Sequence, residues 1–179
     1  MTDFGPGVWP PAPIRTERLV LREPEAGDRA AFVELLASPE VHTYLGGPHP
    51  RETLERELPE VPGRRPGSFV VALDGAMIGR VLLGAATGPC RPAAEGKAEL
   101  GYLFLPGAWG HGYAREACAA ALDWFASVLP GEPVVLTTRT ANTASTRLAA
   151  RLGFTEVERF HAWDAEQWLG ERAPATPCG

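Results

Sequence analysis

The chain has 179 residues, of which 45% are hydrophobic and 22% charged, and its formal net charge at pH 7 is −5. These values are typical of one globular domain with a sizeable core, and they argue against a basic surface for nucleic acid. The three cysteines share no CxxC spacing and no apolar run reaches about 18 residues, so we expect no disulfide framework, no metal site, no membrane span and a reducing cytoplasm.

Proline and glycine mark the two ends of the expected domain. Residues 1–13 are rich in proline and are expected to be a flexible lead-in, and residues 173–179 are expected to be a flexible tail. Residues 14–172 then form a single domain.

The first part of this domain reads as one strand followed by helices. Residues 14–22 predict a strand, because Leu19 and Leu21 alternate with charged residues. Asp28 is expected to cap a helix that ends near residue 38. Two shorter helices are expected over residues 40–45 and 51–60.

The middle of the chain predicts a hairpin and a central strand. Asp74-Gly75 lies between the apolar runs 69–73 and 77–83, which is a strong hairpin signal. Residues 84–97 are loop-like in composition, and residues 99–105 form an apolar strand that Pro106-Gly107 ends.

A glycine-rich turn follows this strand and opens the next helix. It runs Trp109-Gly110-His111-Gly112-Tyr113-Ala114-Arg115, and apolar residues then recur at helical spacing up to Phe125. N–H groups at a helix start lack intrahelical partners, and the helix dipole adds positive charge, so such a turn favours an anion. Gly110 and Gly112 carry no Cβ, which lets the backbone approach a phosphate. The sequence lacks a P-loop tripeptide and a Gly-x-Gly-x-x-Gly fingerprint, and a plain strand-to-helix connection stays open as the alternative.

The last part of the chain predicts a strand, a helix and two final strands. The strand covers residues 134–138, and the helix begins after residue 140 and stops at Gly153. Residues 154–159 and 163–169 read as the final strands. The order of elements predicts an α/β or α+β fold with helices on both faces of a sheet.

Three motifs, spread over nearly the whole chain, occur together. They are Thr16-Glu-Arg-Leu-Val-Leu-Arg22, the turn Gly110-His-Gly-Tyr-Ala114, and Asn142-x-x-Ser145 followed by Leu152-Gly-Phe154. Together they resemble the GNAT acetyltransferases, most closely the branch that includes the ribosomal-protein N-terminal acetyltransferases. Trp109 departs from the pattern, since that family usually has Gln or Arg there. The resemblance implies a GNAT-like mixed sheet, mostly antiparallel, with one splayed parallel strand pair.

The resemblance also implies direct transfer of an acetyl group from acetyl-CoA to a primary amine, without a metal. The turn would hold the pyrophosphate of acetyl-CoA with Trp109, Gly110, His111, Gly112, Tyr113, Ala114 and Arg115. The backbone of Leu103, Phe104 and Leu105 would pair with the pantetheine arm, and Asn142 would hold its distal part. The Ser145 hydroxyl would donate to the leaving thiolate. The simpler alternatives are a helix N-cap for Asn142 and a buried hydroxyl bonded to a backbone carbonyl for Ser145.

Two carboxylates are candidates for the general base. Glu99, at the start of the central strand, is the first candidate and Asp164 is the second. Strand parity decides whether Glu99 faces the amine, and a bulge would reverse that parity. A solvated charge at a strand end is the alternative for Glu99. A base matters more for a Lys acceptor, with a pKa of about 10.4, than for an α-amino group near about 7.7–8.0.

The acceptor stays open among a protein N-terminus, a polyamine, an amino acid and an aminoglycoside. We expect no nucleic-acid or membrane partner, and a homodimer is one assembly to test. The competing class is a non-catalytic GNAT-like module that binds acyl-CoA, or nothing, and serves regulation.

Overall fold

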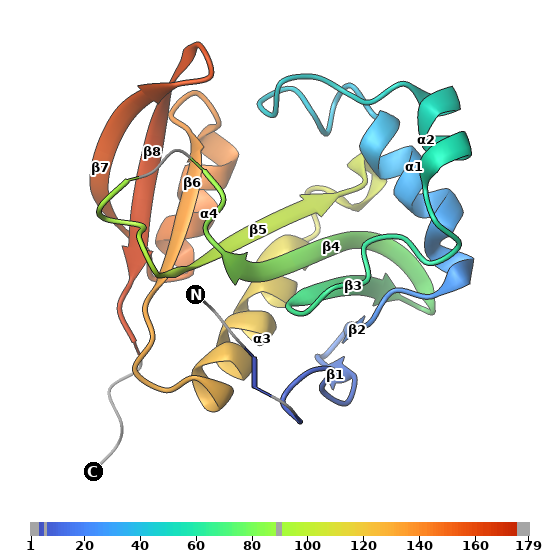
Figure 1. Cartoon of the computed structure of the whole chain (residues 1–179), viewed down its shortest axis with the longest axis horizontal. Helices are drawn as coiled ribbons and strands as arrows, with labels where there is room; N and C mark the ends of the chain where they lie inside the picture. Colours follow the sequence, from blue (N-terminus) through green and yellow to red (C-terminus); the bar gives the residue numbers. More distant parts are fainter. Residues whose placement is uncertain (1–3, 6, 89–90, 175–179) are drawn as a thin grey trace.

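The computed structural model describes residues 4–5, 7–88 and 91–174, and in this part of the chain eight strands form one sheet (Figure 1). The strands are β1 (Ile14–Arg15), β2 (Leu19–Arg22), β3 (Ser68–Leu73), β4 (Ala76–Ala85), β5 (Ala98–Phe104), β6 (Val134–Arg139), β7 (Thr155–Ala162) and β8 (Ala165–Arg172). The helices are α1 (Arg29–Ala37), α2 (Arg51–Glu57), α3 (Tyr113–Val128) and α4 (Thr143–Arg151), with the 3₁₀ turns η1 (Ala26–Asp28) and η2 (Pro106–Ala108). None of the helices described is long and apolar enough to cross a membrane.

The sheet has the strand order β1-β2-β3-β4-β5-β6-β8-β7 and opens in the middle. In the described sheet β5 and β6 run parallel, whereas the other neighbouring strands run antiparallel. The parallel pairing is confined to Ala98 with Val134 and Glu99 with Val135. Beyond these pairs the two strands diverge, as Figure 1 shows, and we call this opening the fork. The predicted fold, including the splayed parallel pair, is confirmed.

Helices cover both faces of the sheet, as predicted. On one face Phe32 and Leu35 of α1 pack against Val70 and Met77. On the other face α3 and α4 share the larger core cluster with the sheet, for example through Cys118. This arrangement places the start of α3 and the start of α4 on the same face of the fork.

Two hairpin turns have the same geometry, and the sequence revealed one of them. Asp74 and Gly75 have φ of 50° and 82° and join β3 to β4, which confirms the predicted Asp-Gly turn. Trp163 and Asp164 have φ of 50° and 57° and join β7 to β8, so the prediction of a strand starting at residue 163 was wrong. This turn contains no glycine, and Asp is one of the few other residues that readily adopts positive φ.

Two local predictions near the start of the domain were also wrong. The expected strand over residues 14–22 is a small hairpin of β1 and β2, because Thr16 and Leu19 close a turn between them through their backbones at 2.9 Å. The expected helix over residues 40–45 is a series of turns, with three-residue backbone bonds such as Leu45 N–H to the His42 carbonyl at 3.0 Å. This segment is too short, between Pro39 and the following glycines, to propagate an α-helix.

The proline-rich lead-in carries side chains that belong to the core. Phe4 is 9% exposed and lies 5.3 Å from Trp124, measured between ring centroids. Trp9 contacts Phe69 at 5.0 Å in an edge-to-face arrangement. Apolar packing thus ties Phe4 and Trp9 to α3 and β3, which a prediction based on proline content did not anticipate. The expected C-terminal tail lies mostly outside the described residues.

Asp28 begins α1 as predicted, but its side chain does not cap that helix. Its carboxylate accepts two hydrogen bonds from Arg22, at 2.8 and 2.9 Å, and one from the N–H of Glu25 at 2.8 Å. Burial disfavours the charged carboxylate, but these bonds outweigh it and hold the pKa of Asp28 below its ordinary value. The pair therefore ties β2 to the start of α1.

We expect Asp28→Asn to lower the free energy of unfolding by about 3 kcal/mol at pH 7, because it leaves the Arg22 side chain, which is 15% exposed, with only the more distant and exposed Glu25 carboxylate, at 3.8 Å, as a counter-charge. Since the pKa of Asp28 is lower in the folded state, its contribution is present above the unfolded pKa of about 3.9 and fades as the pH falls through the folded pKa. Urea unfolding at a series of pH values measures this difference.

The pair of Glu34 and Arg51 provides the matched control. It has the same 2.8 Å length, but its side chains are 58% and 48% exposed. Glu34→Gln should cost less than about 1 kcal/mol. Equal losses for the two variants would contradict the role given to Asp28.

Candidate active site

The glycine turn presents a row of unused N–H groups at the start of α3. Gly110 and Gly112 have φ of 80° and 79°, a left-handed conformation that glycine adopts at little cost. None of the hydrogen bonds among the described residues uses the N–H groups of residues 110–115, whereas the N–H of Glu116 donates to the Gly112 carbonyl at 3.1 Å. The turn therefore has the donors and the dipole of an anion site.

Space for a ligand lies beside this turn. A Cβ placed on Gly110 would meet no other atom within 4 Å, and one on Gly112 would first meet the Arg18 guanidinium at 3.5 Å. His111 and Tyr113 stack on each other, with ring centroids 5.3 Å apart, and Arg115 is exposed. The turn is thus open toward solvent.

Trp109 connects the turn to the end of β5. Its indole N–H donates to the Phe104 carbonyl at 2.9 Å, and the residue is 49% exposed. At the position where the motif usually has Gln or Arg, this chain therefore has an indole whose N–H ties the turn to the strand.

The backbone N–H and C=O groups of successive residues in β5 point alternately toward β4 and toward the fork. The N–H of Leu105 donates to the Ile78 carbonyl at 2.9 Å, so Leu105 is paired with the β4 side. Because successive residues of a strand point their N–H and C=O groups in opposite directions, Leu103 also faces β4, whereas Phe104 and Tyr102 face the fork. Of the three residues predicted to pair with a pantetheine arm, only Phe104 has its backbone groups directed toward the fork. Tyr102 was not predicted.

Asn142 and Ser145 lie together at the start of α4. The Asn142 side-chain oxygen accepts the N–H of Ser145 at 3.2 Å, so Asn142 is a helix N-cap, and its amide NH₂ group takes part in no hydrogen bond among the described residues. Ser145 is 8% exposed. Its Oγ lies 2.6 Å from the hydroxyl oxygen of Tyr102 on β5. The partner of Ser145 is therefore a phenol across the fork, and not the backbone carbonyl that the simpler alternative supposed.

Tyr102 is the site residue that the sequence did not reveal. Burial raises its pKa to about 12, despite the hydrogen bond with Ser145, so the phenol stays protonated at neutral pH. A protonated phenol can donate to Ser145 Oγ, which leaves the serine proton free to point elsewhere. The sequence offered one indication of its position, the alternation of side chains along β5. Tyr102 lies two residues from each of the core residues Leu100 and Phe104, so its side chain points to the same face of the sheet.

The two candidate bases lie in different settings. β5 pairs with β4 from Ala98 to Phe104 in a regular register, without the bulge that would reverse its parity. Glu99 therefore points to the face opposite Leu100 and Tyr102, at the closed end of the fork, and is partly exposed. Asp164 is exposed in the β7–β8 turn, beyond the far end of β6 (Figure 1).

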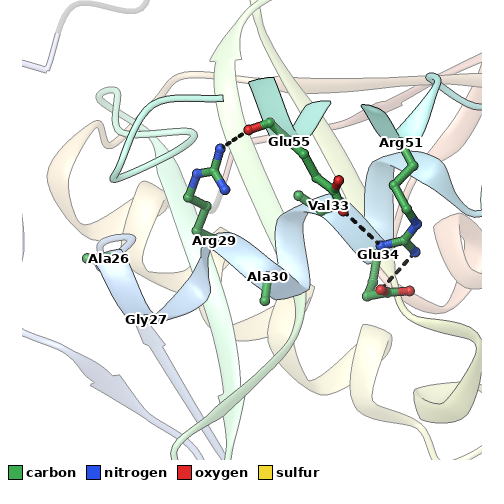
Figure 2. A pocket seen from close by; sticks show the side chains of 8 residues that line it. All are labelled: Ala26, Gly27, Arg29, Ala30, Val33, Glu34, Arg51 and Glu55. Atoms are coloured by element: carbon green, nitrogen blue, oxygen red, sulfur yellow. Dashed lines mark hydrogen bonds and ion pairs between the residues drawn. The ribbon is translucent and has the colours of Figure 1, made fainter. Parts of the chain in front are cut away.

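A surface pocket lies away from the fork. It has a volume of about 610 Å³ between α1 and α2 and is lined by Arg29, Glu34, Arg51 and Glu55, whose side chains pair with one another or with nearby backbone (Figure 2). None of the predicted site residues lines it. A second pocket, of about 320 Å³, touches Leu105 at the end of β5. Among the described residues no three His, Cys, Asp or Glu side chains are grouped to hold a metal ion.

Known proteins are similar to this chain in sequence or in structure. A curated relative, the uncharacterized protein YkkB of Bacillus subtilis, is 29% identical over 162 residues, which span 88% of this chain and 93% of that protein. A GNAT-family acetyltransferase from Bacillus anthracis superposes with a TM-score of 0.75 at 22% identity, over 90% of this chain and 98% of that one. RimL, a ribosomal L7/L12 α-N-protein acetyltransferase solved with coenzyme A, superposes with a TM-score of 0.66 at 16% identity, over 91% and 98% of the two chains.

The sequence model of one family covers most of the chain. The model described as the acetyltransferase (GNAT) domain matches residues 18–155. The match begins within the turn before β2 and ends at the start of β7, so it contains the glycine turn, the fork and the start of α4. The chain therefore belongs to the GNAT acetyltransferase family.

Proposed function

We propose that this protein transfers an acetyl group from acetyl-CoA directly to a primary amine. The observation that carries the proposal is the fork between β5 and β6, which has unused N–H donors beside it and a serine–tyrosine pair across it. Acetyl-CoA is consumed in such a reaction and is therefore a substrate.

The proposed binding mode follows the exposed backbone groups. The N–H groups of residues 110–115 would hold the pyrophosphate. The backbones of Phe104 and Tyr102 would pair with the pantetheine arm where β6 has diverged from β5, and the Asn142 amide would bind a carbonyl of that arm. Coenzyme A in the complex of RimL, a fold neighbour, supports this class of ligand.

The proposed chemistry uses both faces of the fork. Glu99, on one face, accepts the proton of the attacking amine, directly or through a water molecule. A backbone N–H of the splayed strand stabilises the oxyanion of the tetrahedral intermediate. Ser145, on the other face, donates a hydrogen bond to the leaving thiolate while Tyr102 holds its hydroxyl. The nucleophile and the leaving group thus lie on opposite sides of the sheet.

Direct transfer agrees with the setting of Cys118. This thiol is completely buried on α3, and burial raises its pKa, so it stays neutral and unreactive. Cys118 therefore offers no nucleophile for an acyl-enzyme, and we expect the amine to attack the thioester itself.

A protein N-terminus is the first acceptor to test, because RimL, a fold neighbour, is an α-N-protein acetyltransferase. Polyamines, amino acids and aminoglycosides are the other classes. A cytoplasmic location and a homodimer stay predictions.

A thiol-release assay over these four amine classes tests the proposal, with mass spectrometry of the acceptor as the second readout. We expect release of coenzyme A to depend on one class and to match acetylation of its amine. Tight binding of acetyl-CoA without release over any amine would instead favour a regulatory acyl-CoA-binding module.

Ser145→Ala should lower kcat about 10- to 100-fold, because a hydrogen bond to a charged leaving group, worth about 1.5–3 kcal/mol, is lost in the transition state. The KM for acetyl-CoA should change only a few-fold, since the ground-state thioester needs no such donor. Tyr102→Phe should lower kcat by a smaller factor. Steady-state kinetics of both variants measure these effects.

Ser127→Ala is the matched control, because Ser127 is exposed on α3 and bonds to the Trp124 carbonyl at 2.6 Å. It should leave kcat unchanged. A raised KM with normal kcat for Ser145→Ala would mean that this hydroxyl positions acetyl-CoA. A lower melting temperature with normal kinetics would mean that it serves only the fold.

A further inference from the structure

Arg18, in the turn between β1 and β2, reaches across to the glycine turn. Its NH1 donates to the His111 carbonyl at 2.9 Å, over a sequence separation of 93 residues. Its Nε donates to Glu116, in the first turn of α3, at 2.8 Å, and NH2 lies 2.6 Å from the same carboxylate oxygen. One guanidinium therefore holds the turn and the helix that follows it.

The Glu116 carboxylate is held from a second side. Its other oxygen accepts the Arg18 backbone N–H at 2.9 Å and the Thr16 hydroxyl at 2.7 Å. Burial disfavours the charged carboxylate, but these bonds and those of the guanidinium hold the pKa of Glu116 below its ordinary value. The carboxylate therefore stays charged at neutral pH and keeps Arg18 in place.

The Arg18 guanidinium also lies over the Tyr113 ring, 4.6 Å from its centroid, and Tyr113 in turn stacks on His111. The planar group thus makes contacts along its edge and on its face. An arginine suits this position, because a lysine offers one point charge without the planar fork.

The bond to the His111 carbonyl has a geometric consequence for the next residue. In a trans peptide the C=O of one residue and the N–H of the following residue point in opposite directions. A guanidinium that holds the His111 carbonyl on its own side therefore leaves the Gly112 N–H pointing away from Arg18, to the opposite side of this peptide. That N–H takes part in no hydrogen bond among the described residues.

We propose that Arg18, held by Glu116, is a positioning residue that orients the peptide between His111 and Gly112 for binding the pyrophosphate of acetyl-CoA. This inference rests on the proposed function. The Glu116 carboxylate neutralises the guanidinium, and each of its three nitrogens already contacts His111 or Glu116, which uses three of its five N–H groups. We therefore assign Arg18 to holding the turn, and the variants below distinguish this role from direct binding of the phosphate.

Calorimetry with acetyl-CoA, and kinetics with both acetyl-CoA and S-acetylpantetheine, test this role. S-acetylpantetheine carries the same thioester but no pyrophosphate. Arg18→Ala should weaken acetyl-CoA binding about tenfold and leave kcat/KM for S-acetylpantetheine unchanged. The affinity of Arg18→Lys for acetyl-CoA should lie between the affinities of Arg18→Ala and the wild type. Arg15→Ala removes the same charge from an exposed residue of β1. It should change neither the affinity for acetyl-CoA nor kcat/KM for S-acetylpantetheine.

Glu116→Gln separates positioning from direct phosphate binding and serves as the second variant if Arg18→Ala does not fold. Positioning predicts weaker acetyl-CoA binding, because Arg18 loses its anchor, whereas a direct phosphate ligand would bind equally or more tightly once its counter-charge is removed. Unchanged acetyl-CoA binding in Arg18→Ala, or equal losses with both thioesters, would overturn the inference. A wild type that binds no acetyl-CoA would overturn the proposed function first, and this inference with it.

Discussion

Gly112→Asp is expected to abolish binding of acetyl-CoA while the protein stays folded. The new carboxylate would lie at the N–H groups that we assign to the pyrophosphate, and like charges brought together cost several kcal/mol, so the affinity should fall by more than about 100-fold. Folding should survive, because Asp tolerates the positive φ of this position and its Cβ would meet only Arg18, at 3.5 Å. Calorimetry and a thermal melt of the same sample measure both properties.

Gly112→Asn separates charge from bulk at this position. The side chain has the same size and the same tolerance of positive φ but no charge, so binding should weaken less than in Gly112→Asp. Unchanged affinity in Gly112→Asp would remove the pyrophosphate from this turn. A melt that shows Gly112→Asp unfolded would transfer the test to Gly112→Asn.

Glu99→Gln is expected to lower kcat by about 100-fold or more, which is the range for loss of a general base. The regular register of β5 points Glu99 to the face opposite Ser145, where the amine would approach. The loss should be larger for a Lys acceptor than for an α-amino acceptor, because less of the Lys amine is neutral at pH 7. Measuring kcat against pH for both acceptors tests this difference.

Asp164→Asn is the matched carboxylate-to-amide control and should have a mild effect, since Asp164 lies exposed in a hairpin turn. The reverse pattern would move the role of the base to Asp164. Mild effects in both variants would mean that the amine arrives neutral and needs no base from the protein.

Features encoded by neighbouring residues could be predicted from the sequence. The Asp74-Gly75 turn follows from two adjacent residues that accept positive φ, and the start of α3 follows from the glycines and the apolar spacing after them. The fork was expected from motifs on both sides of it, because their resemblance to GNAT acetyltransferases implies a splayed strand pair. Each of these signals is local or belongs to a known motif.

Features that depend on distant residues could not be predicted. The bond between Tyr102 and Ser145 joins residues 43 apart, and the pair of Arg18 and Glu116 spans 98 residues. Local periodicity says which face a side chain takes, but it does not say which partner meets it there. The prediction missed the β7–β8 turn for another reason. One of the two left-handed residues of this turn is Trp163, and tryptophan is rarely found in that conformation.

A crystal structure of the protein with bound coenzyme A would test the central claim most directly. We predict that the pyrophosphate oxygens accept hydrogen bonds from the N–H groups of residues 110–115 and that the pantetheine arm lies between β5 and β6. The sulfur should lie within hydrogen-bond distance of Ser145 Oγ. Coenzyme A bound instead in the pocket between α1 and α2, with the fork empty, would contradict the proposed site.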